Sequence, residues 1–439
     1  MLLLLSFIKI QVTVWKKRKK YSIIASNSGC GLEYKWICTA IKRHGVCFKY
    51  CRGEECFKTI VVVCDVLGEE INGTTIAAMN LVRTLIAKGH EVRVVCPDEF
   101  RRGQPGFYIV PKLNVGPFNG YVEKNGVAIA KADKDTLRLA LDGADAVHII
   151  TPFFLSRAAL KMAKEMGITV TAGFHCQAEN FSNHIFLMNS HGFNHKVYRY
   201  FYKHFYKYVD CVHYPSQFIR ETFEEECGHK PNGRVISNGV NTRIQKRETK
   251  RPDKMQDKFV ILFTGRYSRE KSHEVLIKAT SLSRYSEKIQ LIFAGQGPLE
   301  DKLRKLSQKL LKIQPVFKFF GRDEMVDVIN YAALYVHPAE VEIEAIACLE
   351  AIACGTVPVI ADSKRSATRF FALDEKNLFR PNDPQDLADK IDYWLEDTER
   401  REKRSIEYSG YSKKFAQDYS MNEMERMICE TVESKKVAG

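Results

Sequence analysis

The stretch HPAEVEIEAIACLEAIACGTVPVIA, residues 337–361, contains the local pattern that decides the fold. Residues 344–354 are predicted to form a helix, because Gly355 is a suitable C-cap and Pro358 follows shortly after it. The apolar residues 357–361 then indicate a buried strand. A helix that leads directly into an apolar strand is typical of α/β domains with a parallel sheet.

A carboxylate interrupts this apolar helix at Glu350. Its neighbours three and four positions away are Ile346, Ala347, Ala353 and Cys354. Burying a charge among them is costly unless the charge is paired or hydrogen-bonded. One interpretation is a buried ion pair with an Arg or Lys. The other is a carboxylate kept for ligand hydroxyl groups, as an acid holds the ribose in dinucleotide sites. Glu342, with seven residues between it and Glu350, is a second candidate acid.

Short apolar runs alternate with helical patterns on both sides of this stretch. A first series of strands is predicted at 59–65, 91–96, 145–150, 168–174, 209–214 and 234–237, with helices at 74–88, 154–166, 191–208 and 216–226. A second series of strands is predicted at 258–264, 289–294, 316–319, 334–337 and 357–361. The alternation indicates two doubly wound domains around a cleft, where ligands bind at the carboxyl ends of the strands.

The expected organisation has five segments. They are residues 1–56, an N-terminal domain at 57–240, a linker at 241–257, a C-terminal domain at 258–408 and a closing helix at 409–439 with Ser420 as its N-cap. Residues 1–56 are interpreted either as a weak membrane anchor or as surplus sequence ahead of the natural start. We favour the second, because the first clear strand begins only at Thr59.

Charge and cysteine content exclude two classes of function. Residues 1–56 hold 11 of the 67 basic residues but only 3 of the 53 acidic ones, so the body of the protein is only mildly basic. A nucleic-acid partner is therefore not expected. Cys47, Cys51 and Cys56 lack a clear zinc spacing, and the cysteines elsewhere suit burial in a reducing compartment.

Two cations follow the first strand of the C-terminal domain. Strand 258–264 ends at Gly265, and Arg266 and Lys271 occupy the loop and the start of the next helix. Cations beside a helix N-terminus form an anion site, and the helix predicted from Glu344 starts at the same sheet edge. The pattern predicts a cradle for a diphosphate.

Several motifs in this order resemble the retaining glycosyltransferases of family 4, which have the GT-B fold of two Rossmann-like domains. They are GRYSREKS at 265–272, FAGQGPLEDKL at 293–303, FFGRDE at 319–324, the 337–361 stretch and ISNGVN at 236–241. The N-terminal half is similar to that family at 65–97 and 144–177. The resemblance covers residues 58–437.

The resemblance implies a role for each candidate residue. Arg266 and Lys271 would bind the donor diphosphate and stabilise the leaving nucleotide. Glu342 would contact the transferred sugar, and Glu350 the ribose. The remaining donor-side candidates are Gly73, Gly265, Arg322, Ile343 and Glu344, with Gly321 and Arg322 bordering the base.

His175, at the end of strand 168–174, would lie beside the reacting centre and is counted with the catalytic residues Glu342, Arg266 and Lys271. Each residue has a structural alternative: Gly73 in an ordinary turn, His175 as a buried structural residue, and Lys271 as an exposed first-turn residue. Asp133 is interpreted as an N-cap rather than a metal ligand, and no metal or cofactor is expected.

One stretch departs from the family pattern. The family usually has glycines just after the first acid, where this chain has Ile343, Glu344 and Ala345. The bulkier and more acidic loop leaves the identity of the donor open. UDP-glucose is the leading expectation, followed by UDP-galactose and GDP-mannose. The expected reaction is metal-independent transfer of an α-linked hexose, with a non-catalytic sugar-nucleotide or polysaccharide-binding protein, a capsule glycosyltransferase, and an epimerase or phosphorylase as alternatives.

One segment bears on the identity of the acceptor. Residues 193–208, FNHKVYRYFYKHFYKY, are predicted to form a helix in which aromatic side chains are interleaved with four cations. Lys196, Arg199, Lys203 and Lys207 fall on one helical face. This face is interpreted either as a solvated surface or as a docking surface for anionic lipid. The second interpretation implies a membrane lipid acceptor such as diacylglycerol. We expect a cytoplasmic protein, with peripheral attachment to the inner face of the membrane as the alternative.

Overall fold

The structure is a computed structural model, and it describes residues 10–17, 20–27, 51–52, 55–67, 73–114, 116, 129–183, 185 and 187–438. The interpretation of residues 1–56 lies largely outside these residues. The described parts of that segment are two antiparallel strand pairs, β1 (Ile10–Lys17) with β2 (Lys20–Asn27) and β3 (Cys51–Arg52) with β4 (Glu55–Cys56). Within the described residues, no helix combines the length and the apolar composition that crossing a bilayer requires.

The N-terminal domain is built on a parallel sheet of seven strands in the order β11-β10-β9-β8-β5-β6-β7. The strands are β5 (Thr59–Val63), β6 (Glu91–Cys96), β7 (Phe107–Ile109), β8 (Ala146–Ile149), β9 (Thr169–Gly173), β10 (Cys211–Tyr214) and β11 (Gly233–Val235). Their apolar side chains alternate between two core clusters, because successive residues of a strand face opposite sides of the sheet.

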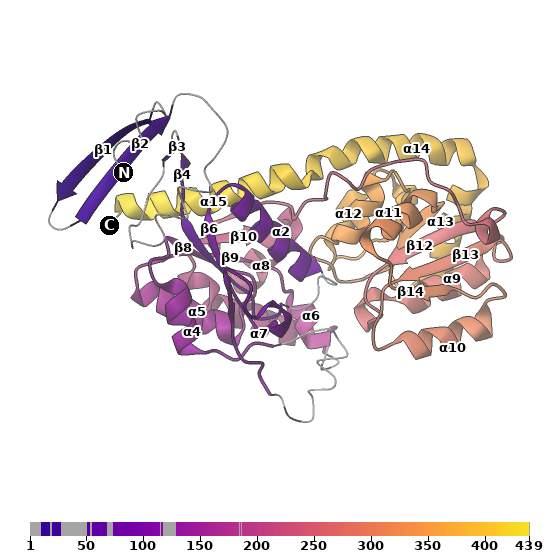
Figure 1. Cartoon of the computed structure of the whole chain (residues 1–439). Helices are drawn as coiled ribbons and strands as arrows, with labels where there is room; N and C mark the ends of the chain where they lie inside the picture. Colours follow the sequence, from indigo (N-terminus) through magenta and orange to yellow (C-terminus); the bar gives the residue numbers. More distant parts are fainter. Residues whose placement is uncertain are drawn as a thin grey trace.

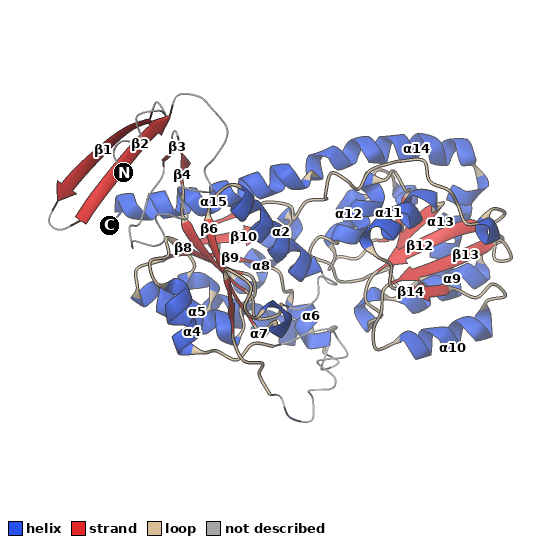
Figure 2. Cartoon of the chain, in the orientation of Figure 1, coloured by secondary structure: helices blue, strands red, loops and turns tan. Residues whose placement is uncertain are grey.

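Helices cover both faces of this sheet (Figures 1 and 2). The N-terminal domain contributes α2 (Gly73–Ala87), α4 (Lys134–Leu141), α5 (Phe154–Glu165), α6 (Ala178–Asn183), α7 (His191–His204) and α8 (Gln217–Cys227). Asp133 caps α4 by accepting a hydrogen bond from the Thr136 N–H at 2.8 Å, so its interpretation as an N-cap is confirmed.

The C-terminal domain has a parallel sheet of six strands in the order β14-β13-β12-β15-β16-β17. The strands are β12 (Phe259–Thr264), β13 (Ile289–Ala294), β14 (Val316–Lys318), β15 (Leu334–His337), β16 (Pro358–Ala361) and β17 (Leu378–Phe379). The helices are α9 (His273–Leu282), α10 (Glu300–Leu310), α11 (Arg322–Tyr331), α12 (Ile346–Ala353), α13 (Pro384–Glu396) and α14 (Thr398–Tyr411). The prediction of two doubly wound α/β domains is confirmed.

The last helix, α15 (Gln417–Ala438), returns from the C-terminal domain and packs on the N-terminal one (yellow in Figure 1). Its buried apolar residues join the core on the α2 face of the N-terminal sheet: Met421, Met424, Met427, Ile428 and Val432. The prediction that Ser420 caps this helix is wrong, because the helix begins at Gln417 and encloses Ser420 as a buried residue.

Two chain segments cross between the domains side by side. The Val240 N–H donates to the Phe415 carbonyl at 2.7 Å, and the Gln417 N–H donates to the Val240 carbonyl at 2.9 Å. Gly239 makes this approach possible, since a Cβ there would lie 2.6 Å from the Gln417 Cα. The domains are therefore joined by a hydrogen-bonded pair of crossings rather than by one free linker.

Candidate active site

The loop after β12 carries the predicted anion site. It passes through Gly265 and Arg266 into a short 3-10 turn, Arg269–Lys271, that precedes α9. The loop after β13 packs against it backbone to backbone: a Cβ on Gly295 would lie 2.1 Å from the Gly265 carbonyl oxygen. This close packing fixes the loop at the carboxyl end of the sheet, where ligands of such sheets bind.

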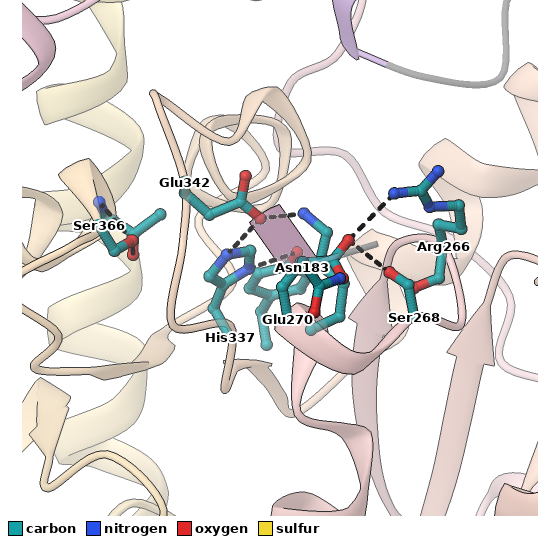
Figure 3. A network of polar contacts seen from close by, with 10 residues as sticks. Asn183, Arg266, Ser268, Glu270, His337, Glu342 and Ser366 are labelled. Atoms are coloured by element: carbon teal, nitrogen blue, oxygen red, sulfur yellow. Dashed lines mark hydrogen bonds and ion pairs between the residues drawn. The ribbon is translucent and has the colours of Figure 1, made fainter. Parts of the chain in front are cut away.

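Glu342 is held between a lysine and a histidine (Figure 3). Its carboxylate forms an ion pair with Lys271, and its Oε1 lies 3.2 Å from Nε2 of His337, the last residue of β15. Burial alone would raise the pKa of Glu342, but the Lys271 charge and the His337 contact outweigh it and lower the pKa to about 2. Glu342 is therefore ionised throughout the physiological range.

Glu350, on α12, is in the opposite situation. It is half-buried, and no side chain in the described residues forms an ion pair or hydrogen bond with its carboxylate. Burial raises its pKa to about 7, with Arg322 at the start of α11 acting weakly in the other direction. The described structure thus gives no support to the ion-pair interpretation of Glu350.

The helix predicted at 344–354 begins two residues later than expected. Its N-cap is Ala345, which has a φ of +64°, so Glu344 lies in the preceding loop and its placement in the first helical turn is wrong. Glu344 reaches the other domain instead: its Oε2 accepts hydrogen bonds from the Asn238 backbone N–H at 2.9 Å and the Asn238 side-chain amide at 2.7 Å. Burial raises the pKa of Glu344 to about 7.

The rest of this loop also contacts the N-terminal domain. The Ile343 carbonyl accepts a hydrogen bond from Ser216 Oγ at 2.6 Å, and the Ile343 side chain packs against the N-terminal core. Gly73, the first residue of α2, faces Ile346, whose Cδ1 would lie 4.0 Å from a Cβ added at that glycine. The bulky residues that replace the family's glycines therefore bind the two domains together.

His175 lies just beyond β9, with its ring directly over Gly173. A Cβ on Gly173 would be 2.4 Å from the ring, so this position needs a glycine. The His175 ring centre is 5.3 Å from that of His213 on β10. Burial, followed by the proximity of His213 and His148, holds the pKa of His175 well below its usual value. His175 is therefore a neutral imidazole at physiological pH.

The sequence did not reveal Glu270 as a site residue. Its buried carboxylate accepts hydrogen bonds from Ser268 Oγ at 2.6 Å and from the Arg266 guanidinium at 3.1 Å (Figure 3). A third hydrogen bond, from Asn183 Nδ2 at 2.7 Å, comes from the N-terminal domain. Glu270 could have been found from the sequence, because it is the acid that lies between Arg266 and Lys271 in GRYSREKS. Nothing in the sequence pointed to Asn183.

The structure therefore gathers the predicted residues into two groups. Lys271 meets Glu342, and Arg266 lies in the same loop as Lys271 but is paired with Glu270. Arg322 acts on the charge of Glu350 from α11. The contacts among the described residues do not link His175 directly to either group.

Metal-ligating atoms come together elsewhere. Among the described residues, His90, Glu425 and Cys429 bring their ligand atoms within 4.8 Å of one another at the seam between α15 and the N-terminal domain. The Lys58 N–H donates to His90 Nδ1 at 3.2 Å, so the ring proton is on Nε2, 2.8 Å from Glu425. A cation would have to displace that proton, and the arrangement fits a clamp for α15 better.

The chain is similar to known glycosyltransferases in both sequence and fold. The family model described as "Glycosyltransferase Family 4" matches residues 71–244. The model described as "Glycosyl transferases group 1" matches residues 244–409. Over 231 residues the chain is 26% identical to the α-monoglucosyldiacylglycerol synthase of Streptococcus pneumoniae, covering 49% of this chain and 51% of that protein. The chain thus spans about half of that relative's length.

Two solved structures are similar. The Anabaena protein HepE, bound to UDP and glucose, is 15% identical and superposes with a TM-score of 0.65 over 85% of this chain and all of its own. The catalytic domain of cholesterol-α-glucosyltransferase from Helicobacter pylori is 49% identical over 36% of this chain and 99% of its own, with a TM-score of 0.35. The two family matches together span residues 71–409, and with the fold they show that the chain belongs to glycosyltransferase family 4 with the GT-B architecture.

Proposed function

We propose that this protein transfers an α-glucosyl group from UDP-glucose to a hydroxyl group of a membrane lipid, with retention of the anomeric configuration and without a metal ion. The name of the pneumococcal relative supports a glucosyl group and a diacylglycerol-type acceptor. HepE, whose structure holds UDP and glucose, supports a UDP-sugar donor.

The donor would lie along the carboxyl edge of the C-terminal sheet. Arg266 and Lys271 lie in the loop and turn that follow β12, and both would face the diphosphate as charge develops on the departing UDP. Preorganised cations at that position stabilise the transition state electrostatically, which is the task that a metal ion performs in other transferases. Glu350, which lacks a described partner, would accept hydrogen bonds from the ribose, with Arg322 near the base.

The reacting sugar would lie between the domains. Glu342, ionised and fixed by Lys271 and His337, would accept hydrogen bonds from sugar hydroxyl groups. His175, a neutral imidazole, can donate or accept one hydrogen bond at the sugar without adding charge. Gly73 at the start of α2 leaves the space that close approach of the donor requires.

The observation that carries the lipid acceptor is the cationic face of α7 and the turn after it. Lys196, Arg199, Lys203 and Lys207 are all exposed, and none has an acidic partner among the described residues. Tyr198, Phe201, Phe205 and Tyr206 pack inward, while Tyr200 and Tyr208 are each 47% exposed. Half of the aromatic side chains thus anchor the helix on the sheet. The four cations have no acidic partner to compete with a headgroup surface, although Tyr200 accepts a hydrogen bond from Arg157 at 2.7 Å and Lys207 lies 4.7 Å from the centre of the Tyr208 ring.

A transfer assay tests the reaction. UDP release from UDP-glucose is measured with vesicles that contain diacylglycerol, a sterol, or neither, and with a soluble disaccharide. We expect UDP release and a new glycolipid only with a lipid acceptor. Transfer to the disaccharide alone would point to a polysaccharide acceptor, and the absence of UDP release with every acceptor would favour a non-catalytic protein.

Co-sedimentation with vesicles tests the docking surface. Changing Lys196, Arg199, Lys203 and Lys207 to Gln should remove about 1 kcal/mol of attraction per cation on anionic vesicles. A control variant with the same change in charge alters four exposed lysines elsewhere: Lys250, Lys254, Lys305 and Lys309. If both variants bind anionic vesicles equally well, α7 is not the docking surface.

A further inference from the structure

Glu270 joins the donor loop to the opposite domain. The residue lies in the Arg269–Lys271 turn, and its side chain is almost completely buried. Its Oε1 accepts hydrogen bonds from Arg266 and Ser268 within its own loop, whereas its Oε2 accepts one from Asn183 at 2.7 Å (Figure 3). The two oxygen atoms of the Glu270 carboxylate thus accept hydrogen bonds from different domains.

Asn183 is the last residue of α6, which follows His175 on the acceptor side of the cleft. Its Nδ2 donates to Glu270, and its Oδ1 is buried without a hydrogen-bond partner among the described residues. A buried amide that makes one bond where it can make several carries an energetic cost, so the Asn183–Glu270 bond offsets part of that cost. The geometry indicates a specific link rather than incidental packing.

Arg266 is paired with the carboxylate that forms this link. Its guanidinium is about one third exposed, and Glu270 is the acid that it meets in the described structure. Burial would raise the pKa of Glu270, but Arg266 and Lys271 outweigh burial and keep the pKa below its usual value, so the carboxylate stays ionised. A long flexible cation held by one fixed carboxylate takes its direction from that carboxylate.

We propose that Asn183 and Glu270 are positioning residues, through which closure of the two domains places Arg266 against the donor diphosphate. When the domains separate, Asn183 leaves Glu270, whose Oε2 then loses its fixed partner, and Arg266 is held less firmly. The donor loop would be fully arranged only when the acceptor-side domain is in place. Premature reaction of the donor with water is then slowed, because the leaving diphosphate is not yet stabilised.

The proposal rests on the proposed transferase activity, and a second cross-domain contact provides its control. Arg365 donates to Asn189 Oδ1 at 2.8 Å, and its carbonyl accepts from Gln177 Nε2 at 3.1 Å. These bonds also hold the domains together. Arg365 continues to the Glu340 carboxylate at 2.6 Å, and the Glu340 backbone N–H donates to the Glu270 carbonyl at 3.0 Å. Asn189 therefore reaches the backbone of Glu270 and not the carboxylate that holds Arg266. Asn180, also on α6, forms no hydrogen bond to the C-terminal domain within the described residues and is the second control.

The experiment compares Asn183→Leu with Asn189→Ala and Asn180→Ala in the full chain. We expect Asn183→Leu to lower kcat by about tenfold, the effect of losing one hydrogen bond to a charged group. The dissociation constant of UDP, measured by calorimetry, should rise by less than the fall in kcat, because Arg266 still reaches the diphosphate but is no longer held in one direction. Glu270→Gln should lower kcat further, since it weakens the hold on Arg266 itself.

Equal kcat values for Asn183→Leu and Asn189→Ala would overturn the proposal, because the Asn183–Glu270 hydrogen bond would then only stabilise the contact between the domains. A readout without catalysis separates this result from failure of the proposed activity. In the UDP-bound protein, hydrogen exchange of the Lys271 and Ser272 amides should be faster in Asn183→Leu than in wild type and unchanged in Asn180→Ala. Unchanged exchange in Asn183→Leu would contradict the link, whether or not sugar transfer is found.

Discussion

The loop that carries Glu342 and the helix that carries Glu350 are separated by only a few residues, yet they keep the same side chain in opposite states. Glu342 is paired with Lys271 and has a pKa of about 2, whereas Glu350 has no described ion pair and a pKa of about 7. Both side chains are largely buried, so burial does not explain the difference between their pKa values. The nearby cation decides which carboxylate is charged at every physiological pH and which titrates.

This difference suits two separate tasks. A permanently charged and rigidly held acid is suited to a sugar whose position must not vary during bond cleavage. An acid that lacks a protein partner is suited to a ligand that supplies the missing donors, and its affinity for that ligand becomes dependent on pH. The following changes test the comparison, beginning with the largest expected effect.

Lys271→Met should make Glu342 resemble Glu350. We expect glucosyl transfer to fall by about 100- to 1000-fold, because a preorganised charge is removed where charge develops. The free energy of unfolding should also fall, by about 3 kcal/mol, since a buried carboxylate loses its partner. Calorimetry should show a smaller loss at pH 5 than at pH 8, because burial without the cation raises the pKa of Glu342 and protonation then relieves the penalty.

The matched control is Lys278→Met, which removes an exposed cation on α9 and should leave rate and melting temperature unchanged. If Lys271→Met melts at the wild-type temperature at both pH values, the Glu342 carboxylate does not depend on Lys271.

Glu350→Gln should weaken UDP binding by about tenfold at pH 8, because hydrogen bonds to a charged acceptor become bonds to a neutral one. The empty variant should melt about 2–4 °C above wild type at that pH, corresponding to about 1 kcal/mol. The pKa of Glu350 is raised in the folded state, so its favourable contribution is complete below the unfolded value of about 4.5 and is lost as pH rises to about 7. The stabilisation by Gln should therefore disappear at pH 4.5.

Wild-type affinity for UDP should fall as pH drops below about 7, while that of Glu350→Gln should change little over the same range. Titration calorimetry between pH 5.5 and 8 (about one measurement per half unit of pH) makes the comparison. Earlier melting of the variant with unchanged UDP affinity would restore the ion-pair interpretation of Glu350.

Glu344→Gln is expected to have the smallest effect. At pH 5.5, where the raised pKa leaves Glu344 mostly protonated, the melting temperature should move by less than about 2 °C, because the amide oxygen of Gln can still accept hydrogen bonds from Asn238. UDP affinity should stay within about twofold of wild type. A loss of fivefold or more would place Glu344 in contact with the donor, the role that the family resemblance implies for it.

The strands were predictable because parallel strands buried on both faces are short apolar runs. The strand 91–96 was predicted at the bounds observed for β6, and 289–294 at those of β13. Helix starts were less predictable. Glu344 and Ser420 both have residue types that favour a helical first turn or N-cap, but tertiary contacts place them elsewhere: Glu344 binds Asn238, and Ser420 is enclosed within α15.

Residues that act within one loop left a trace in the sequence, whereas residues that act across the cleft did not. Arg266, Glu270 and Lys271 lie within one motif, so their proximity is local. Asn183 reaches Glu270 over a separation of 87 residues, and an asparagine at the end of a short helix carries no pattern of its own. Such a contact depends on how the two domains are placed, which no local periodicity encodes.

The return of α15 has a consequence for synthesis of the chain. The methionines and aliphatic residues of α15 that complete the N-terminal core are made about 180 residues after the sheet that they cover. At about 5–20 residues per second, the α2 face of that sheet waits for roughly 10–40 s without its covering helix. The N-terminal domain therefore leaves the ribosome before the C-terminal one but is completed after it, and its apolar face stays exposed to aggregation throughout that interval.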